Sequence, residues 1–455
     1  MPESVDLVIH GETVVTMNAE RQKITDGAVV VHGGRIVAVT TLADAAERFE
    51  SAETLGGPGT AVIPGLINAH QHLTGDRLLR STIPDDLGLD DALMQWALPA
   101  HAAHTADLDE LSATLSLVEG VTNGITYTVE AGTVAHPDRV LAAFDTVGVG
   151  GTIGSWGWDI GEGPHIGSVD EVLARQTRAL DLVTDHPLVD AWVTLVGHDL
   201  MSDELVDAAS ALARSRDTRL TFHMSPSPGD AASYLARTGR RPMVHLAELG
   251  VLGDHVLIAH AVHVDDGEVA TLLEHDVAVA SCPWAYLRLG QGVTHSFRHR
   301  ELIRKGGRIA LGCDSENAGD SIDILLTARL FAGLLKDVAG DPREFTAEQA
   351  LALATIDGAR AIGMQHEIGS LEVGKRADVV VLDITGPGWT PRPADPLIGM
   401  IWAGGGRSVR DVVASGRVVV SDHVCHGVDL TSLAAAAQEA HHQLVSRCGA
   451  HPRNE

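Results

Sequence analysis

The chain has 455 residues, of which 45% are hydrophobic and 21% charged, a globular balance that excludes a disordered or fibrous protein. Its 61 acidic and 33 basic residues give a net charge of −28, which would repel nucleic acid and anionic membranes. We therefore expect neither as a partner. No apolar run reaches the roughly 20 residues that cross a bilayer, and the N-terminus lacks a secretory pattern, so we predict a cytoplasmic protein. The four cysteines include no CxxC pair, which argues against a thiolate metal site.

The two ends of the chain share a strand-rich texture. Residues 6–41 alternate β-branched runs with Gly and Asn turns, and the same pattern returns at 369–383 and 409–422. We predict that residues 1–61 and 366–430 together form one small β-sandwich. The last stretch, 431–455, is expected to be a terminal helix and tail.

The middle of the chain has a different rhythm, in which short apolar runs alternate with amphipathic stretches. Strands that alternate with helices indicate βαβ units with parallel pairing. Eight such units predict an α/β fold, a (β/α)8 barrel over residues 62–365, inserted into the sandwich. The eight expected strands are 61–67, 124–129, 149–155, 191–196, 219–223, 256–260, 277–281 and 308–313.

Two long connections interrupt this rhythm, at 73–105 after the first predicted strand and at 284–294 after the seventh. Long connections in compact domains usually act as lids or binding loops. In a barrel, the connections that follow strands lie on the active-site face. We therefore expect both to shape a binding site.

Histidines gather at the predicted strand ends. His70 and His72 are two residues apart, so on an extended segment their side chains point the same way. His223, His260 and Asp314 end the fifth, sixth and eighth predicted strands. Four imidazoles and a carboxylate suit a divalent ion such as Zn²⁺, which could lower the pKa of a bound water to about 7. Asp314 could accept the proton of that water.

Several segments resemble the amidohydrolase superfamily: "PGLINAHQHL", "LGCDSENAGDSIDILLTARL" and "GSLEVGKRADVVVLD". The branch is the chlorohydrolase and aminohydrolase group, which includes S-adenosylhomocysteine deaminases, guanine deaminases and triazine hydrolases. The resemblance covers essentially the whole chain. It implies a homo-oligomer that binds one divalent ion, zinc or alternatively iron. It also implies Asp314 as the base and a metal site formed by His70, His72, His223, Asp314 and, near the metal or its water, His260.

The sequence differs from this family at three positions that matter for catalysis. The fourth predicted strand lacks the lysine of binuclear relatives, which favours a single metal ion. Deaminases of the group carry a glutamate three residues after the fifth-strand histidine, where this chain has Pro226. Many relatives have a histidine at the end of the seventh strand, where this chain has Ser281. Both losses weaken deamination of a purine-like ring and leave amide, urea or carbamate hydrolysis open.

We predict a metal-dependent hydrolase of non-peptide carbon–nitrogen bonds, deaminase-like, acting on a small nitrogen-containing molecule. A metal-binding relative without activity is a further alternative. The catalytic candidates are Asp314, His260 and His263, of which His263 could instead only orient a neighbour. The candidate substrate contacts are Trp96, His198, Trp284, Tyr286, Arg288 and Glu316. The aromatic side chains among them could equally pack the loops onto the barrel, and His198 could form hydrogen bonds at the rim of the site.

Overall fold

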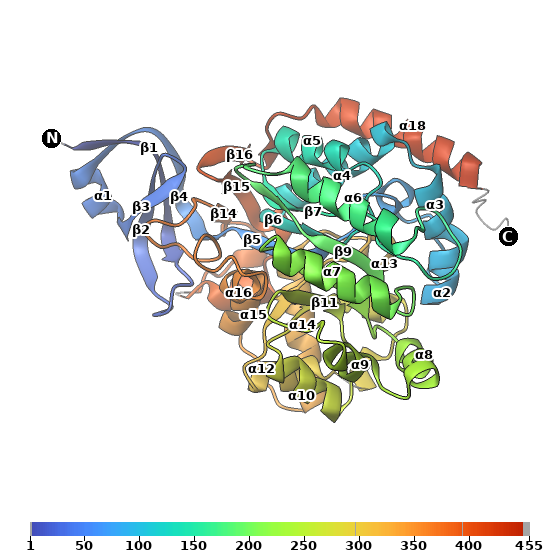
Figure 1. The fold of residues 1–455 in the computed structure, drawn as a ribbon. Helices are drawn as coiled ribbons and strands as arrows, with labels where there is room; N and C mark the ends of the chain where they lie inside the picture. The colour runs from blue at the N-terminus through green and yellow to red at the C-terminus, as the bar shows by residue number, and fades with distance from the viewer. Residues whose placement is uncertain (1, 296, 394, 449–455) are drawn as a thin grey trace.

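The computed structural model describes residues 2–295, 297–393 and 395–448, which form a barrel with a β-sheet beside it (Figure 1). In that part of the chain, no helix has the length and apolar character needed to span a membrane. Both architectural predictions are confirmed: the middle of the chain forms the barrel, and the two ends combine in the sheet.

The sheet has eight strands and joins the two chain ends through one antiparallel pair. Val381 of β14 lies opposite Val62 of β4 in that pair. Both valines are fully buried, as are Val29 and Val31 of β2, because alternate residues of these strands point into a shared apolar layer. Helix α1 (Leu42–Arg48) leads into β4. The strands, in sheet order, are β17 (Val424–Cys425), β16 (Arg417–Ser421), β15 (Val409–Ala414), β14 (Val379–Asp383), β4 (Phe49–Pro64), β1 (Glu3–Val15), β2 (Lys23–His32) and β3 (Arg35–Thr41).

The barrel strands run parallel, and the first and last are joined by hydrogen bonds. The Asp314 amide donates to the His70 carbonyl at 3.0 Å, and the Cys313 amide donates to Asn68 Oδ1 at 3.1 Å. The predicted fourth strand is divided at Trp192, so that β8 pairs with β7 and β9 pairs with β10. The barrel strands are β5 (Leu66–Gln71), β6 (Ile125–Glu130), β7 (Gly150–Ile153), β8 (Val189–Ala191), β9 (Val193–Gly197), β10 (Leu220–Met224), β11 (Val256–His260), β12 (Ala278–Ser281) and β13 (Ile309–Leu311).

Helices surround the barrel because their apolar residues recur on one face. In α7, for example, Leu205, Ala209 and Ala213 are buried at a spacing of four, and Ser202 caps the N-terminus. The helices between and after the strands are α4 (Ala106–Thr122), α5 (Pro137–Val147), α6 (Val169–Leu182), α7 (Asp203–Ser215), α8 (Pro228–Thr238), α9 (Pro242–Glu248), α10 (Asp266–Glu274), α11 (Pro283–Arg288), α12 (His299–Arg304), α13 (Glu316–Gly319), α14 (Ile324–Ala339), α15 (Ala347–Ala354) and α16 (Ile356–Ala361). Short helical segments η3 (Val293–His295), η4 (Pro387–Trp389), α17 (Leu397–Trp402) and η5 (Gly406–Ser408) complete this part.

The long connection after β5 is largely helical and is held in place by the last helix, α18 (Leu430–Cys448). Leu444 of α18 is fully buried in one cluster with Leu78 and Leu79 of the connection. His441 Nδ1 lies 2.8 Å from the Leu78 carbonyl oxygen. Figure 1 shows α18 running along the same side of the barrel as α4 and α3. The connection contains η1 (Asp76–Leu79), α2 (Leu89–Ala92), a π-helical turn η2 (Leu93–Ala97) and α3 (Leu98–Ala103).

Candidate metal centre and substrate cavity

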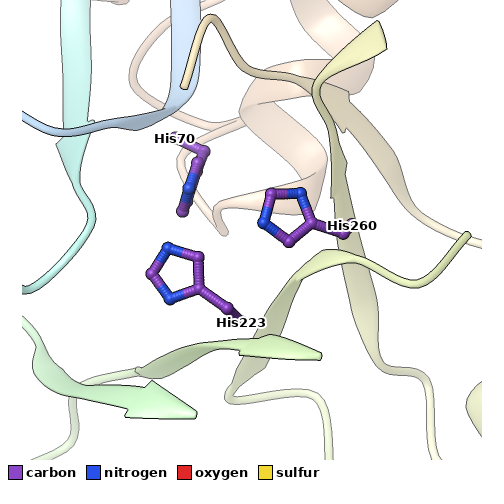
Figure 2. A group of neighbouring side chains, drawn as sticks. All are labelled: His70, His223 and His260. Atoms are coloured by element: carbon purple, nitrogen blue, oxygen red, sulfur yellow. The ribbon is translucent and has the colours of Figure 1, made fainter. Parts of the chain in front are cut away.

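Three predicted metal ligands converge from three barrel strands. His70 lies in β5, His223 in β10 and His260 at the end of β11. Figure 2 shows the three rings gathered around one point. One ring nitrogen from each lies within 4.8 Å of the others. Because side chains at the carboxyl ends of parallel barrel strands share one face, residues far apart in sequence meet here.

His72 and Asp314 complete the group. His72 Nε2 lies 3.1 Å from His223 Nε2 and 3.4 Å from Asp314 Oδ1. Asp314 Oδ1 is also 3.6 Å from His70 Nε2. The structure therefore brings together all five residues predicted from the strand ends.

Two of the imidazoles are oriented by bonds on their outer nitrogen. His223 Nδ1 donates to the Val196 carbonyl at 2.8 Å, which leaves the lone pair of Nε2 facing the centre. His72 Nδ1 lies 3.0 Å from the Thr133 hydroxyl. Outer contacts of this kind fix the ring orientation of metal-binding histidines. They make Thr133 part of the site, although the sequence analysis does not single it out.

The backbone at the site adopts left-handed conformations that are rare for residues with side chains. His260 has φ +80° and Asp314 has φ +66°. Such conformations persist only where the surroundings enforce them, and they concentrate at functional sites. Around Asp314 the surroundings are polar: Gln71 Nε2 donates to its carbonyl at 2.7 Å, and the Ser315 amide donates to its Oδ1 at 2.8 Å.

Burial keeps three of the imidazoles neutral. It lowers the pKa of His70, brings that of His260 to about 3, and holds that of His223 well below its ordinary value. Burial opposes the charge of Asp314 as well, but His70 and His72 beside it hold the pKa of this carboxyl well below its usual range. For His72 the effect of Asp314 outweighs burial and raises the pKa.

These residues fit a divalent cation. His70 is 1% exposed, yet neither of its ring nitrogens has a hydrogen-bond partner among the described residues. A buried imidazole without partners is unfavourable unless something else, such as a metal ion, binds its lone pair. Neutral imidazoles with an ionised carboxylate are a donor set that zinc accepts. Cys282 also lies close to His70 and Asp314, but burial raises the pKa of its thiol and disfavours the thiolate that binds metals.

A cavity of about 220 Å³ opens directly above these residues. His72, His223, His260 and Asp314 form part of its lining. Most of the remaining wall is apolar and comes from the long connection after β5 and from the loop after β7. Both long connections named in the sequence analysis contribute, the one after β12 through Leu289 and Gln291. The apolar wall includes Ile83, Leu93, Leu98, Trp156, Trp158 and Leu200.

Of the six predicted substrate contacts, the structure places only His198 in the cavity lining. Its Nδ1 lies 2.9 Å from Asp230 Oδ2, and its ring stacks on His223. The side chain of Arg288 turns away and donates to Asp320 at 2.6 Å. Tyr286 is fully buried and accepts a hydrogen bond from the Cys282 amide at 2.8 Å.

The other three aromatic and acidic candidates also lie outside that lining. Trp96 is half-buried on η2, where Leu93 and Ala97 face the cavity instead. Trp284 is half-buried on α11, next to Gly319. Glu316 is buried and accepts a hydrogen bond from Ser116 at 2.7 Å. Burial raises its pKa to about 7.

His263, the remaining catalytic candidate, is bound elsewhere. Its Nε2 donates to the Gln291 carbonyl at 2.6 Å, and it does not belong to the cavity lining. This hydrogen bond ties His263 to the loop after β12, so His263 contacts a neighbouring loop and not the cavity. His260 and Asp314 are the two catalytic candidates that face the cavity.

Several lining residues were missed from the sequence. Trp156 and Trp158 belong to "GSWGWD", directly after β7, where glycines flank the aromatics. Asp76 lies four residues beyond His72, close enough to be noticed as a second acidic group near the site. Gln291 and Asn317 carry no comparable signal, because a single amide on a loop is ordinary surface chemistry.

The chain belongs to the amidohydrolase family. The model of that family, described as "Amidohydrolase family", matches residues 61–419. A 5-methylthioadenosine/S-adenosylhomocysteine deaminase from Syntrophobacter fumaroxidans is 30% identical over 417 residues, covering 92% of this chain and 93% of the relative. This membership makes the chain a metal-dependent hydrolase of carbon–nitrogen bonds, as predicted.

Solved structures agree in fold over nearly the whole chain. An adenosine deaminase from Xanthomonas campestris with bound zinc has a TM-score of 0.93 at 30% identity, covering 98% of this chain and 100% of its own. Atrazine chlorohydrolase from Arthrobacter aurescens, in complex with zinc, has a TM-score of 0.86 at 25% identity, covering 96% and 100%. Relatives with bound zinc and the histidine-rich centre of this chain both support a divalent metal site.

Proposed function

We propose that this enzyme is a mononuclear zinc aminohydrolase that removes an amino group from a small nitrogen-containing ring. The observation that carries the proposal is the convergence of His70, His72, His223, His260 and Asp314 beneath a single apolar cavity. Zinc suits this donor set, and iron is the alternative. The deaminase names of the relatives support the amino group as the part that leaves.

In this proposal His70, His72, His223 and Asp314 would hold the ion, with His260 beside it. A bound divalent ion would lower the pKa of a water to about 7 and so supply hydroxide at neutral pH. Asp314 is ionised at neutral pH, because the neighbouring histidines hold its pKa low, and as a carboxylate beside the proposed metal site it could accept the proton of that water. Asp314 can then return the proton to the departing nitrogen.

His260 has a separate part. Its Nδ1 is buried and has no hydrogen-bond partner among the described residues, and burial brings its pKa to about 3. A neutral imidazole facing the cavity can donate a hydrogen bond to the oxygen or nitrogen that gains charge as the carbon is attacked. The apolar walls contributed by Trp156 and Trp158 favour a flat substrate and exclude water around it.

One observation favours a second candidate, the hydrolysis of an amide, urea or carbamate. Pro226 lines the cavity at the position where the resemblance implies a glutamate that passes a proton to the ring. Proline has no proton to exchange, so substrates whose nitrogen leaves with less help would be accommodated. The products separate the two candidates: the first would replace a ring amino group by oxygen and release ammonia, whereas the second would cleave an N-substituted amide, urea or carbamate and release a larger amine.

The test is to incubate zinc-loaded and iron-loaded enzyme with aminoheterocycles, ureas, carbamates and amides, and to identify products by mass spectrometry. The panel would include 5′-methylthioadenosine, S-adenosylhomocysteine, adenosine and guanine. Replacement of an amino group by oxygen is the expected result. A metal-loaded enzyme inert to every compound would favour the inactive relative. Homo-oligomerisation, a cytoplasmic location and the lack of nucleic-acid binding stay predictions from the sequence.

A further inference from the structure

Helix α4 carries a row of polar side chains along one buried face. Four polar residues recur at spacings of three, four and three, which places them on the same side of the helix. They are Asp109, Ser112, Ser116 and Glu119, here called the polar stripe. The first three are no more than 1% exposed, and the side chain of Glu119 is 19% exposed. Buried polar groups in folded proteins are nearly always paired, and each of these has its partners in loops that follow barrel strands.

Glu119 bridges the connection after β5 and the loop after β13. Its Oε2 accepts hydrogen bonds from Arg77 and Arg80, both at 2.5 Å. Its Oε1 accepts from the Ile322 amide at 3.2 Å. Burial opposes the charge of Glu119, but Arg77 and Arg80 hold the pKa of this carboxyl below its ordinary value. Both bridged segments line the cavity, so one carboxylate joins two of its walls.

The two serines of the polar stripe contact the same two segments close to the predicted metal centre. Ser112 Oγ donates to the carbonyl of Leu73, the residue after His72, at 2.9 Å. Ser116 Oγ donates to Glu316, at the start of α13, at 2.7 Å. The polar stripe therefore contacts the chain just after the first barrel strand and just after the last one.

Asp109 fixes the far end of the connection. His104 Nδ1 lies 2.8 Å from Asp109 Oδ1, and His136 Nδ1 lies 2.8 Å from Asp109 Oδ2. His104 is close to the end of the connection, and His136 precedes α5 in the loop after β6. One helix thus binds both ends of the connection and a third loop of the barrel.

The connection itself lies between two small apolar clusters that are separate from the barrel core. On its outer side, Leu78, Leu79 and Ala100 pack with α18. On its inner side, Leu98 packs with Trp156 and the residues around it. Segments with few contacts to the main core open more readily than the core does. The polar contacts to α4 are therefore important for holding this wall in place.

We propose that the polar stripe of α4 sets the width of the cavity, and that Glu119 is a positioning residue that holds the connection after β5 against the loop after β13. Among the described residues, those that line the cavity include none of the polar stripe, so it acts through the loops. Without the charge of Glu119, Arg77 and Arg80 would repel each other and the two walls would separate. The proposal goes beyond the proposed function, since it holds for either candidate reaction.

Hydrogen exchange read by mass spectrometry tests the proposal on the full-length protein. In Glu119→Gln, amides of residues 73–104 and 314–323 should exchange at least about tenfold faster than in wild type, since a hydrogen bond to a charged group is worth that factor. Amides of residues 23–41, in the β-sheet beside the barrel, should exchange at the wild-type rate. Unchanged exchange in the two segments would overturn the proposal. Faster exchange throughout the chain would do so as well, because it would show a general loss of stability.

Further variants separate the charge of Glu119 from other effects. Glu119→Asp keeps the charge and should recover part of the protection. Glu110→Gln is the matched control, because Glu110 also lies on α4, has a side chain that is 37% exposed and pairs with Arg139 at 2.9 Å. It should exchange like wild type, and the same pattern in both Gln variants would contradict the role of Glu119. If Glu119→Gln does not fold, Ser116→Ala should accelerate exchange at 314–323, and wild-type exchange there would reject the proposal.

Two probes measure the cavity wall directly in the zinc-loaded enzyme. Acetohydroxamate chelates a metal ion through its hydroxamate group, and benzohydroxamate does the same but adds a ring that reaches the apolar wall. Isothermal titration calorimetry gives the ratio of the two affinities. The preference for benzohydroxamate should fall about tenfold in Glu119→Gln, because burying an aromatic ring is worth at least that factor. An unchanged ratio would contradict a wider cavity.

This proposal and the proposed function fail separately. Hydrogen exchange needs neither a bound metal nor turnover. An enzyme that hydrolyses none of the compound panel would reject the aminohydrolase proposal, and the exchange pattern of Glu119→Gln would still decide this one. Hydrolysis of the panel with wild-type exchange in Glu119→Gln would do the reverse.

Discussion

The Nε2 atoms of His72 and His223 lie 3.1 Å apart, although His72 follows β5 and His223 lies in β10. The Val196 carbonyl takes the only proton of a neutral His223, so its Nε2 presents a lone pair to the centre. Asp314 Oδ1 approaches the same His72 Nε2 atom, at 3.4 Å. A divalent cation bound at this point, as proposed above, would account for the close approach of these three groups.

Removal of the metal should therefore destabilise the protein as well as inactivate it. A ligand that binds only the folded state stabilises it by about 4 kcal/mol at a thousandfold excess over its dissociation constant. We expect a chelator to lower the melting temperature and abolish hydrolysis, and added zinc to restore both. The measurement is differential scanning calorimetry with metal analysis. An unchanged melting temperature in protein shown to be free of metal would contradict the assigned site.

The Thr133 contact to His72 predicts a selective effect on metal affinity. Thr133→Val keeps the volume but removes the hydroxyl that lies 3.0 Å from His72 Nδ1. Loss of such an outer contact typically weakens metal binding by about 10- to 100-fold. Competition with a chromogenic zinc chelator measures this. Thr133→Ser, which retains the hydroxyl, is the control and should bind zinc within a few-fold of wild type. Equal zinc affinities of Thr133→Val and wild type would contradict the role of the Thr133 hydroxyl in metal binding.

The buried Glu130 predicts a pH-dependent stability. Burial raises its pKa from 4.5 to about 7, even though the amides of Gly132 and Thr133 donate to its carboxylate. A raised pKa in the folded state means that the stabilising contribution of this group is fully present below pH 4.5. It is lost as the pH rises through about 7.

The comparison is between wild type and Glu130→Gln, both free of metal, by urea unfolding from pH 4 to 8. The stability of the variant relative to wild type should rise over this range by about 3 kcal/mol, since one pKa unit corresponds to about 1.4 kcal/mol. A difference that stays constant with pH would show that Glu130 does not titrate in this window.

A glycine beside the proposed metal centre predicts that a larger residue at its position would clash with the backbone. Gly197 ends β9 with φ +83°, and a Cβ there would lie 2.1 Å from the His223 carbonyl oxygen. Gly197→Ala should lower stability by more than about 2 kcal/mol, because the backbone strain and the clash add. It should also weaken zinc binding, since His223 must move. Gly333→Ala, in the interior of α14 with open space around it, should instead stabilise by about 0.5 to 1 kcal/mol. Similar behaviour of the two variants in thermal unfolding would count against this account.

The clustering of the histidines with Asp314 could be predicted from the sequence because these residues obey strand geometry. His70, His223 and His260 end apolar runs, and a barrel collects strand ends on one face whatever the sequence between them. The two-residue spacing of His70 and His72 needs only the periodicity of an extended chain. The barrel, and the sheet formed by the two chain ends, could be predicted from the same periodicities.

The cavity wall could not be predicted in this way. The connection after β5 was expected to bind substrate, but which of its side chains face inward depends on how η2 and α3 pack under α18. Leu93 and His101 face the cavity and Trp96 does not. Arg288 was expected near a substrate and is instead paired with Asp320, a partner that lies 32 residues away on another loop. Tertiary packing of this kind leaves no periodic trace in the sequence.

The most direct test of the central claim compares zinc-loaded wild type with Asp314→Asn on the panel of aminoheterocycles, ureas, carbamates and amides, with products read by mass spectrometry. The substitution is close to isosteric, so the fold should be retained, as circular dichroism would show. Wild type should exchange an amino group for oxygen, and the variant should be slower by at least about a hundredfold, because it lacks the general base. Wild-type turnover by a folded Asp314→Asn variant would contradict the account.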